Sequence, residues 1–450
     1  MANTYLTRTQ GTPTNNKIFT VSCWFKASQV ANEMKLIYSD DNSTNNYTYI
    51  HFSDGSGRIR FQNRNGGSNN TELIWENYIR DFSAFYHLVI AVDSTQATAS
   101  DRVKFYLNGV QQTTLDGSAN TFPPQNQSFT LNSSGYGVDI GANGYNNNAY
   151  FNGLMSYFAF VDGTAYDQSY FGEVDSSSGI WKIKTSPSVT YGNNGFYLKM
   201  DTSSPGSDTS GNSNTFTVSG IPTLTQDNAS NNFATLNTLT YQAASQSNSG
   251  TIQAYDGNTT WKSQGSNQWG TIFSTIAPST GKWYSEVKVG AVGGGAIVGV
   301  VDVADARANS ATEWYIGQSS TGQGYQNNGS ASNGGASYGA TYTTGDIIGC
   351  AMDLDNSKIY WSKNGTFQNS GVPTSGATGT GALTLTANTN YAFAVTGYNT
   401  TTMNCNFGNG FFGTTAVASS NADAAGHGLM EYPVPTGYYT LNTKNLNTYG

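Results

Sequence analysis

The sequence predicts an all-β fold, with two antiparallel β-sandwiches in tandem. The chain has 450 residues, enough for two or three domains with separate cores. It lacks the long amphipathic runs of Ala, Leu, Glu and Lys that helices need. Two segments also repeat one plan, in which an apolar strand ends in Asp93 or Asp353 and the next alternating strand ends in Asn108 or Asn364, each followed by Gly. Because both residues of Asn-Gly tolerate positive φ, the repeat predicts a β-hairpin in each of two similar units.

The first unit, residues 1–175, begins with a strand in which Phe19, Val21, Cys23 and Phe25 alternate with Thr, Ser and Trp. This alternation places one side of the strand on a core. Further strands are expected at 35–38, 47–52, 58–63, 71–75, 87–93, 102–107, 137–141 and 150–162.

Four motifs in order give this unit a family resemblance. They are the strand with Trp24, then His87-Leu-Val, Phe105-Tyr-Leu-Asn-Gly, and a closing Phe151-Asn-Gly-Leu strand. On these motifs the unit resembles the LamG-like (laminin G/pentraxin-type) family. The resemblance implies a concanavalin A-like jelly roll, a fold that mostly binds glycans or proteins and sometimes cleaves polysaccharides.

Residues 176–244 differ in composition from the first unit. A Ser/Gly/Asn-rich loop at 203–212 separates expected strands at 196–200 and 214–218. Aromatic residues recur through the segment, among them Trp181, Tyr191 and Phe216. We therefore expect an ordered, β-rich connector.

The second unit, residues 245–412, has expected strands at 269–273, 281–289, 296–301, 346–355, 359–365, 391–395 and 404–408. It carries Gly281-Lys-Trp-Tyr, an apolar strand that begins Gly345-Asp-Ile-Ile-Gly, the hairpin at Asn364, and a final Asn406-Phe-Gly. In this order the motifs resemble a SPRY domain. That resemblance implies a second concanavalin A-like sandwich.

The C-terminal segment, residues 413–450, should pack back on the second unit, because residues 432–446 echo residues 231–237. The whole arrangement resembles virion proteins of marine tailed bacteriophages, found among fibres, spikes and head decorations. The resemblance implies a virion protein that is made in the host cytoplasm, exposed on the particle and bound to other virion proteins. It also implies a homo-oligomer, with a trimer favoured.

Charge and hydropathy argue against two kinds of partner, nucleic acid and the membrane interior. The net charge of -8 offers no basic stripe for a phosphate backbone, so nucleic acid is not an expected partner. No apolar run is long enough to span a bilayer, so membrane insertion is not expected either.

Met1 leads directly into strand-like sequence without a signal-peptide pattern, which indicates a route other than ordinary secretion.

The cysteines and acidic residues do not define a metal site. Cys23, Cys350 and Cys405 lie in apolar strands at spacings that fit no zinc site, so we expect buried free thiols. A disulfide between Cys350 and Cys405 is the alternative. The LamG resemblance implies that calcium could be a cofactor, and turn or cap roles are the alternative for the acidic residues concerned, Asp40, Asp41, Asp93 and Asp139.

No catalytic residues are predicted. Asp353 and Asp355 alternate, but they stand where a strand ends in a turn, and Glu286 is a lone carboxylate. The three histidines lack a nucleophile-elbow context, and we expect His87 to be packed and hydrogen-bonded.

Glycan binding combines aromatic faces with Asn, Gln and Asp hydrogen-bond partners. Two loops have this composition, and their aromatics could instead pack on neighbouring loops or on another subunit. The candidates are Tyr145, Asn147 and Tyr150 in the first unit, and Trp314, Tyr315 and Tyr325 in the second.

These observations favour a non-enzymatic virion structural protein, of the tail fibre, spike or head decoration kind, that attaches to host-surface carbohydrate or to other virion proteins. One alternative is an exported protein that binds glycans or cleaves polysaccharides. A SPRY-type protein-binding adaptor is another, and it fits the second unit but not the first.

Overall fold

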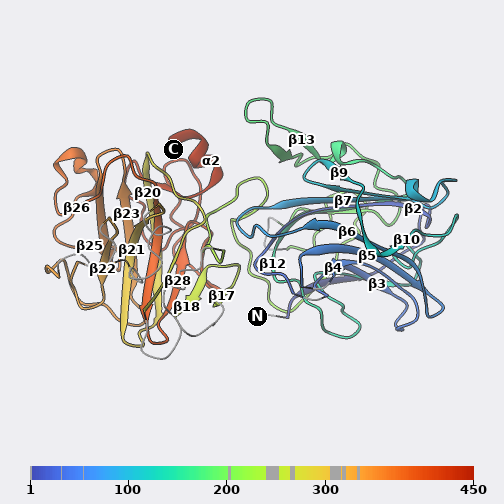
Figure 1. The fold of residues 1–450 in the computed structure, drawn as a ribbon, viewed down its shortest axis with the longest axis horizontal. Helices are drawn as coiled ribbons and strands as arrows, with labels where there is room; N and C mark the ends of the chain where they lie inside the picture. Colours follow the sequence, from blue (N-terminus) through green and yellow to red (C-terminus); the bar gives the residue numbers. More distant parts are fainter. Residues whose placement is uncertain are drawn as a thin grey trace. The chain divides into compact units, whose positions relative to one another are not determined.

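The computed structural model describes residues 3–31, 33–53, 55–200, 204–239, 253–263, 269–304, 316, 321–331 and 335–450. They form two compact units, Met1–Leu224 with Asn228–Ser230, and Thr225–Asp227 with Asn231–Gly450. Both are antiparallel β-sandwiches, as the sequence predicted (Figure 1). Within the described part of the chain, no helix combines the length and the apolar character that a membrane span requires.

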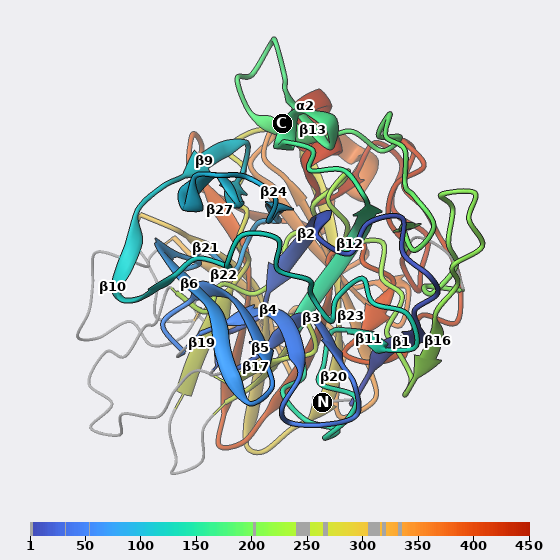
Figure 2. The same ribbon diagram turned by 90° about the vertical axis from the view of Figure 1, so that its right-hand side faces the viewer.

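One sheet of the first unit has eight strands among the described residues (Figure 2). It brings together segments far apart in the sequence, since the strand Tyr5–Thr9 pairs with both Gly137–Ile140 and Thr217–Ser219. In order across the sheet, the strands are β10 (Leu115–Thr121), β6 (Ser68–Tyr78), β5 (Arg58–Asn65), β4 (Tyr47–Phe52), β3 (Lys35–Asp40), β11 (Gly137–Ile140), β1 (Tyr5–Thr9) and β16 (Thr217–Ser219).

The facing sheet has six described strands, and a core of Phe, Leu, Ile and Val side chains fills the space between the two sheets. The order is β15 (Phe196–Leu198), β12 (Gly153–Asp162), β2 (Ile18–Ala27), β7 (Tyr86–Asp93), β8 (Val103–Leu107) and β9 (Val110–Gln112). The hairpin of β13 (Gly172–Val174) and β14 (Trp181–Ile183) and the short helices η1 (Ala99–Asp101) and η2 (Gln168–Tyr170) complete the unit.

Part of the expected connector contributes to the first unit. Strand β15 extends the six-stranded sheet beside β12, and β16 extends the eight-stranded sheet beside β1. Trp181 of β14 covers the outer side of the six-stranded sheet, where it packs with Trp24 and Tyr106 in a second apolar cluster.

The second unit contains a nine-stranded and a four-stranded sheet among its described residues. The larger sheet has β17 (Gln253–Tyr255), β18 (Thr260–Lys262), β28 (Thr402–Asn406), β20 (Lys282–Ala291), β23 (Ile347–Asp353), β24 (Lys358–Lys363) and β25 (Thr366–Phe367), with β26 (Leu383–Thr384) on β24 and β31 (Tyr439–Thr440) on β20. The smaller sheet has β19 (Trp269–Phe273), β27 (Tyr391–Tyr398), β21 (Gly295–Asp302) and β22 (Gln323–Gln326). The remaining elements are β29 (Phe411–Phe412), β30 (Thr415–Ala416), η3 (Pro373–Thr378) and α2 (Thr443–Tyr449).

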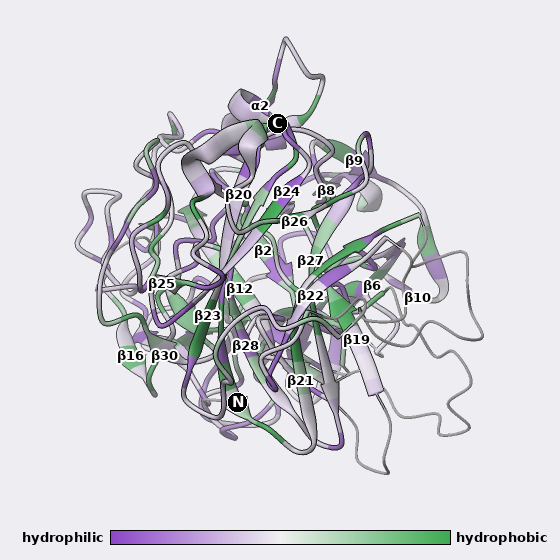
Figure 3. Ribbon diagram, turned by 90° about the vertical axis from the view of Figure 1, so that its left-hand side faces the viewer, coloured by the Kyte–Doolittle hydropathy of each residue, from purple (hydrophilic) through white to green (hydrophobic). Residues whose placement is uncertain are grey.

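The core of the second unit lies between these two sheets. In Figure 3, apolar residues concentrate on strands such as β21 and β23, whereas the connecting loops are mostly hydrophilic. Cys350 and Cys405 are buried free thiols, as is Cys23 in the first unit. Because β20 separates β23 from β28, Cys350 and Cys405 lie on strands that are not neighbours, so they do not form the alternative disulfide.

Both Asn-Gly hairpins are present as predicted. Asn108 and Asn364 have φ of 48°, and the glycines that follow have φ of 81°. Each turn joins two antiparallel strands, and each hairpin pairs with the strand that ends at Asp93 or Asp353. In both units the Asn side-chain oxygen also accepts a hydrogen bond of 2.8 Å from a backbone N–H of the preceding strand. The Asn side chain thus adds one hydrogen bond between the turn and the preceding strand, which explains why Asn suits this position.

Replacing Gly365 by alanine should destabilise the second unit by more than about 1 kcal/mol, because a side chain is strained at positive φ. A Cβ there would also lie 2.6 Å from the ring of Tyr432. Gly437 has the same φ of 81° with nothing within 4 Å, so Gly437→Ala measures the backbone strain alone. Chemical denaturation should show the larger loss for Gly365→Ala. Equal losses would contradict the contribution of Tyr432.

The C-terminal segment packs on the second unit. Strand β31 runs parallel to β20, and Phe233 forms a bridge with Asn442. Met430 and Tyr438 cover the side of the nine-stranded sheet that faces away from the core, where they contact Tyr284 and Tyr360. This segment therefore closes a sheet face that would otherwise expose apolar side chains.

Candidate functional site

The loop between β11 and β12 presents two of the predicted residues to solvent. Asn143 and Asn148 close the loop through paired backbone hydrogen bonds of 3.0 and 3.2 Å. Tyr145 is 44% exposed between them, and Asn147 is exposed with φ of 50°. A closed turn holds an exposed aromatic ring at little further entropic cost, so this loop is suited to contact a ligand.

The end of the same loop is anchored to the eight-stranded sheet. Tyr150 is half-buried, with its ring centroid 6.3 Å from that of Tyr5 on β1. A backbone hydrogen bond also connects the loop to β3, since the N–H of Lys35 donates to the carbonyl of Ala149 at 2.9 Å. Tyr145 therefore lies on a loop that borders this sheet.

The structure places Tyr325 in the core of the second unit instead of on a loop surface. Its ring is fully buried between Tyr338 and Tyr342, at centroid distances of 5.4 and 5.0 Å, and its hydroxyl donates to the carbonyl of Ala340. The Gly and Asn around it suggested a loop, but the segment forms β22 and pairs with β21. Its ring has no free face for a sugar. Trp314 and Tyr315 lie outside the described residues.

The eight-stranded sheet also carries a functional candidate that the sequence analysis missed. On the face that points away from the core, Lys35 of β3 stands opposite His51 of β4, and His51 stands opposite Arg60 of β5. We call these three residues the cationic row. Their neighbours along the strands, such as Ile50 and Phe61, point into the core.

The contact with Lys35 determines which ring nitrogen of His51 carries the proton. The ammonium of Lys35 lies 3.1 Å from Nδ1 of His51 and 4.0 Å from the ring centroid of Tyr49. An ammonium group only donates, so Nδ1 of His51 accepts and the ring carries its proton on Nε2. Burial lowers the pKa of Lys35 to about 8. Burial, together with the charges of Lys35 and Arg60, holds the pKa of His51 well below its usual value.

Three tyrosines lie beside the cationic row on the same face. The rings of Tyr47 and Tyr49 stack with centroids 5.1 Å apart, and Tyr38 lies 6.4 Å from Tyr49. We call Tyr38, Tyr47 and Tyr49 the tyrosine cluster. The Tyr49 hydroxyl donates to Gln62, and the guanidinium of Arg64 lies 5.9 Å from the centroid of Tyr47. Tyr38 and Tyr49 are buried and Tyr47 is partly exposed, so the cluster mainly packs this face of the sheet.

Two carboxylates lie beyond the tyrosine cluster. Asp139 is directly opposite Tyr38 and accepts a 2.9 Å hydrogen bond from the N–H of Gly144. Burial is the main cause that raises the pKa of Asp40 and that of Asp139, and the charge of Asp40 raises the latter further. Across the described ranges, no three His, Cys, Asp or Glu side chains converge as a metal site would require. The described residues therefore add no support to the calcium that the LamG resemblance implied.

A buried Ser–His contact in the first unit is not arranged for catalysis. Nε2 of His87 lies 2.9 Å from the hydroxyl of Ser22, and Nδ1 accepts a 3.0 Å hydrogen bond from the indole N–H of Trp181. Since an indole N–H only donates, the neutral ring is protonated at Nε2 and donates to Ser22. It cannot take a proton from that hydroxyl, as a general base must. Burial also lowers the pKa of His87 to about 3.

The carboxylates considered for hydrolysis have structural partners. Asp353 is fully buried, 2.9 Å from the ammonium of Lys282, and Asp355 accepts a 2.8 Å hydrogen bond from the N–H of Gly281. Glu286 is also buried and accepts from the N–H groups of Glu431 and Tyr432 at 2.8 and 2.9 Å. Burial raises the pKa of Glu286 to about 7. The Glu286 carboxylate thus holds the C-terminal segment on the sheet.

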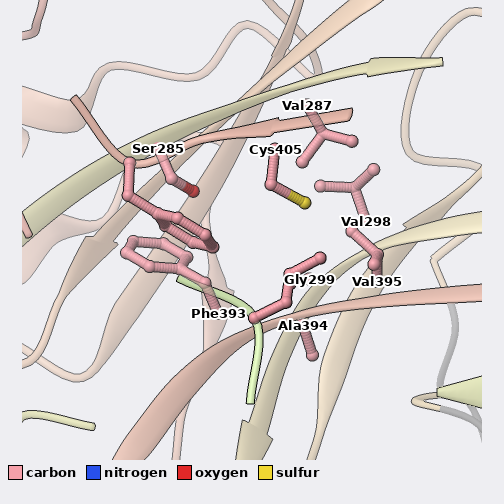
Figure 4. Close-up of a pocket in the computed structure, with 10 residues that line it drawn as sticks. Ser285, Val287, Val298, Gly299, Phe393, Ala394, Val395 and Cys405 are labelled. Atoms are coloured by element: carbon pink, nitrogen blue, oxygen red, sulfur yellow. The ribbon is translucent and has the colours of Figure 1, made fainter. Parts of the chain in front are cut away.

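A cavity of about 10 Å³ lies between the sheets of the second unit. Figure 4 shows the thiol of Cys405 and the hydroxyl of Ser285 among its apolar lining, with Val287 and Phe393 nearby. Such a volume holds at most about one water molecule. The cavity is a packing space within the core and is too small for a sugar.

Comparison with protein families matches two parts of the chain. Residues 1–168 match a laminin G family described as the concanavalin A-like lectin/glucanases superfamily, and residues 282–404 match the SPRY domain. A search of the curated proteins gave no match.

Several solved structures are similar to parts of the chain. The SPRY domain of human HERC1 is 14% identical with a TM-score of 0.27, over 34% of this chain and 91% of that one. A SAP-like pentraxin from Limulus polyphemus is 18% identical with a TM-score of 0.27, over 36% and 71%. The CBM40 of a Ruminococcus gnavus IT-sialidase, bound to α2,3-sialyllactose, is 16% identical with a TM-score of 0.24, over 31% and 72%.

Proposed function

We propose that this chain, which carries a LamG/concanavalin A-like lectin domain followed by a SPRY domain, is a non-catalytic carbohydrate-binding protein. Its binding site is the loop around Tyr145 at the border of the eight-stranded sheet. One observation carries the proposal: an exposed Tyr145 and Asn147 on a loop that paired backbone hydrogen bonds close. The lectin/glucanase description of the matched family supports the same class of ligand.

Tyr145→Ala should weaken glycan binding about tenfold, because it removes an aromatic face that can stack on a sugar ring. Binding of the purified protein to an array of neutral and acidic oligosaccharides measures this. Tyr170→Ala is the matched control, since Tyr170 is 41% exposed in the same unit but lies in η2 next to Tyr166. Equal binding by both variants would remove the loop from the site, and no binding to any glycan would refute the function.

The absence of catalysis is part of the proposal. The protonation of His87 and the structural partners of Asp353 and Glu286 support it. Incubation with laminarin, agar and alginate tests it, and reducing sugar released at enzymatic rates, and lost in Asp353→Asn or Glu286→Gln, would overturn it.

We further propose that the protein is a virion component of the fibre, spike or decoration kind, which contacts other virion proteins. This step is supported by the sequence resemblance of the domain order and of the C-terminal segment. Electron microscopy of purified virions labelled with an antibody to this chain tests the location. Light scattering tests the trimer, and a 48.0 kDa monomer in solution would count against it.

A further inference from the structure

The loop around Tyr145 presents three asparagine side chains that have no hydrogen-bond partner within the described part of the chain. Asn146, Asn147 and Asn148 are exposed, and the hydrogen bonds that close the loop use only the backbone of Asn146 and Asn148. By contrast, the side chain of Asn364 in its hairpin turn bonds to backbone. The three amides of the loop are therefore available to a ligand.

Tyr145 stands beside these amides with its ring open to solvent. Its side chain is 44% exposed, and the ring pair at the ends of this region, Tyr5 with Tyr150, does not include it. The backbone next to the ring packs tightly on the sheet, because a Cβ at Gly144 would lie 2.5 Å from Oδ2 of Asp139 and 2.8 Å from the ring of Tyr5. The ring and the amides thus keep a fixed arrangement, which lowers the entropic cost of binding.

These groups suit a ligand with many hydroxyls. A carboxamide offers two N–H donors and an acceptor oxygen, so it can bond to a hydroxyl in either direction without a charge. An exposed tyrosine ring supplies an apolar face for the C–H side of a sugar ring. An uncharged sugar presents both of the surfaces that the loop can recognise.

The loop itself, which the structure describes completely, has no cation that could attract an acidic group. Residues 141–151 contain no Lys, Arg, His, Asp or Glu. Lys35 meets the loop through its backbone N–H, whereas its ammonium is buried against His51. A carboxyl is in contact with the loop, because Asp139 accepts a 2.9 Å hydrogen bond from the N–H of Gly144. A carboxylate or sulfate on a ligand would therefore lose water without meeting an opposite charge, and Asp139 would repel it.

We propose that the Tyr145 loop binds uncharged sugar residues and discriminates against acidic ones. This inference rests on the proposed carbohydrate binding and names its ligand class. The ring of Tyr145 contacts the apolar side of the sugar, and the amides of Asn146, Asn147 and Asn148 bond to its hydroxyls. Because these groups are exposed instead of enclosed, much of the ligand stays in water, and we expect a dissociation constant on the order of 1 mM.

Titration calorimetry at millimolar ligand concentration compares pairs of oligosaccharides that differ in charge. The pairs are lactose with α2,3-sialyllactose, carboxyl-reduced oligogalacturonate with oligogalacturonate, and agaro-oligosaccharides with their sulfated counterparts. We expect at least one neutral member to bind, about fivefold or more tightly than its acidic partner. Equal binding within the pairs, or tighter binding of an acidic member, would overturn the inference while carbohydrate binding stands. Failure of every glycan to bind would overturn both proposals.

Two substitutions test whether the loop itself discriminates. Asn146→Lys supplies the missing cation and should raise the affinity for the acidic member about threefold or more, with a smaller change for the neutral one. Asn147→Asp keeps the shape of the side chain, and Asp also tolerates the φ of 50° at this position, so the lost N–H donors should weaken neutral binding about fivefold. Asn388→Asp is the matched control, since Asn388 is exposed with φ of 56° in the second unit, and it should change nothing.

Thermal unfolding confirms that each variant is folded. An unchanged ratio of acidic to neutral affinity in Asn146→Lys would overturn the inference. Equal effects of Asn147→Asp and Asn388→Asp would do the same, because the amides of the loop would then have no part in binding.

Discussion

Replacing Trp361 by alanine is expected to lower the free energy of unfolding of the second unit by about 3–5 kcal/mol. The indole is fully buried in the core between the two sheets. It meets the ring of Tyr338 edge to face, with centroids 5.2 Å apart and planes at 89°. Removing it leaves a large cavity, because the two hydrogen-bonded sheets cannot close around the space.

Trp361→Phe provides the control for this prediction. The indole N–H of Trp361 is buried, and it has no hydrogen-bond partner among the described residues. Phenylalanine keeps an aromatic ring against Tyr338 and removes the unpaired donor, so we expect less than half of the loss seen with alanine. Guanidinium denaturation followed by fluorescence measures both variants. A loss below about 1 kcal/mol for alanine would show that this ring does not support the core.

The second unit should become less stable as the pH rises from 4.5 to about 7, because of Glu286. Burial raises the pKa of this carboxyl to about 7 in the folded protein, from an ordinary value of 4.5. Between these values the folded state binds more protons than the unfolded state, so stability falls with rising pH. At about 1.4 kcal/mol for each pKa unit, the loss is on the order of 3 kcal/mol.

Comparison with Glu286→Gln isolates this contribution from every other titrating group. Glutamine stays neutral, so the difference in unfolding free energy between wild type and variant should fall by about 3 kcal/mol from pH 4.5 to 8. A flat difference for Glu286→Gln would mean that its carboxyl is not perturbed. Hydrogen exchange at the amides of Glu431 and Tyr432 reports the same contact locally.

The Asn-Gly hairpins were predictable because their determinants lie within a few residues. Positive φ at Asn108 and Asn364, and the hydrogen bond from each Asn side chain to the preceding strand, involve only the turn and its neighbouring strand. The exposed position of Tyr145 follows in the same way from a short Asn- and Gly-rich segment. Tyr325 has similar neighbours in sequence, yet pairing of β22 with β21 takes it into the core.

The cationic row could not be predicted from alternation alone. In 47–52, Tyr47, Tyr49 and His51 alternate with Thr48, Ile50 and Phe52, so the sequence separates two faces. Both faces carry large side chains, and nothing local says which one meets the core. The row also depends on which strands are neighbours and in what register, because Lys35 and His51 are 16 residues apart. That information is set by the packing of the whole sandwich.

The bridge between Phe233 and Asn442 holds the first and last segments of the second unit together. Ala234 donates a 2.9 Å hydrogen bond to the carbonyl of Leu441, so the segment that enters this unit and the segment that leaves it run side by side. A domain whose two ends meet can be inserted into a loop of another protein, or removed from it, without a change in its own core. Recombination could therefore exchange such a unit between unrelated proteins as a single cassette.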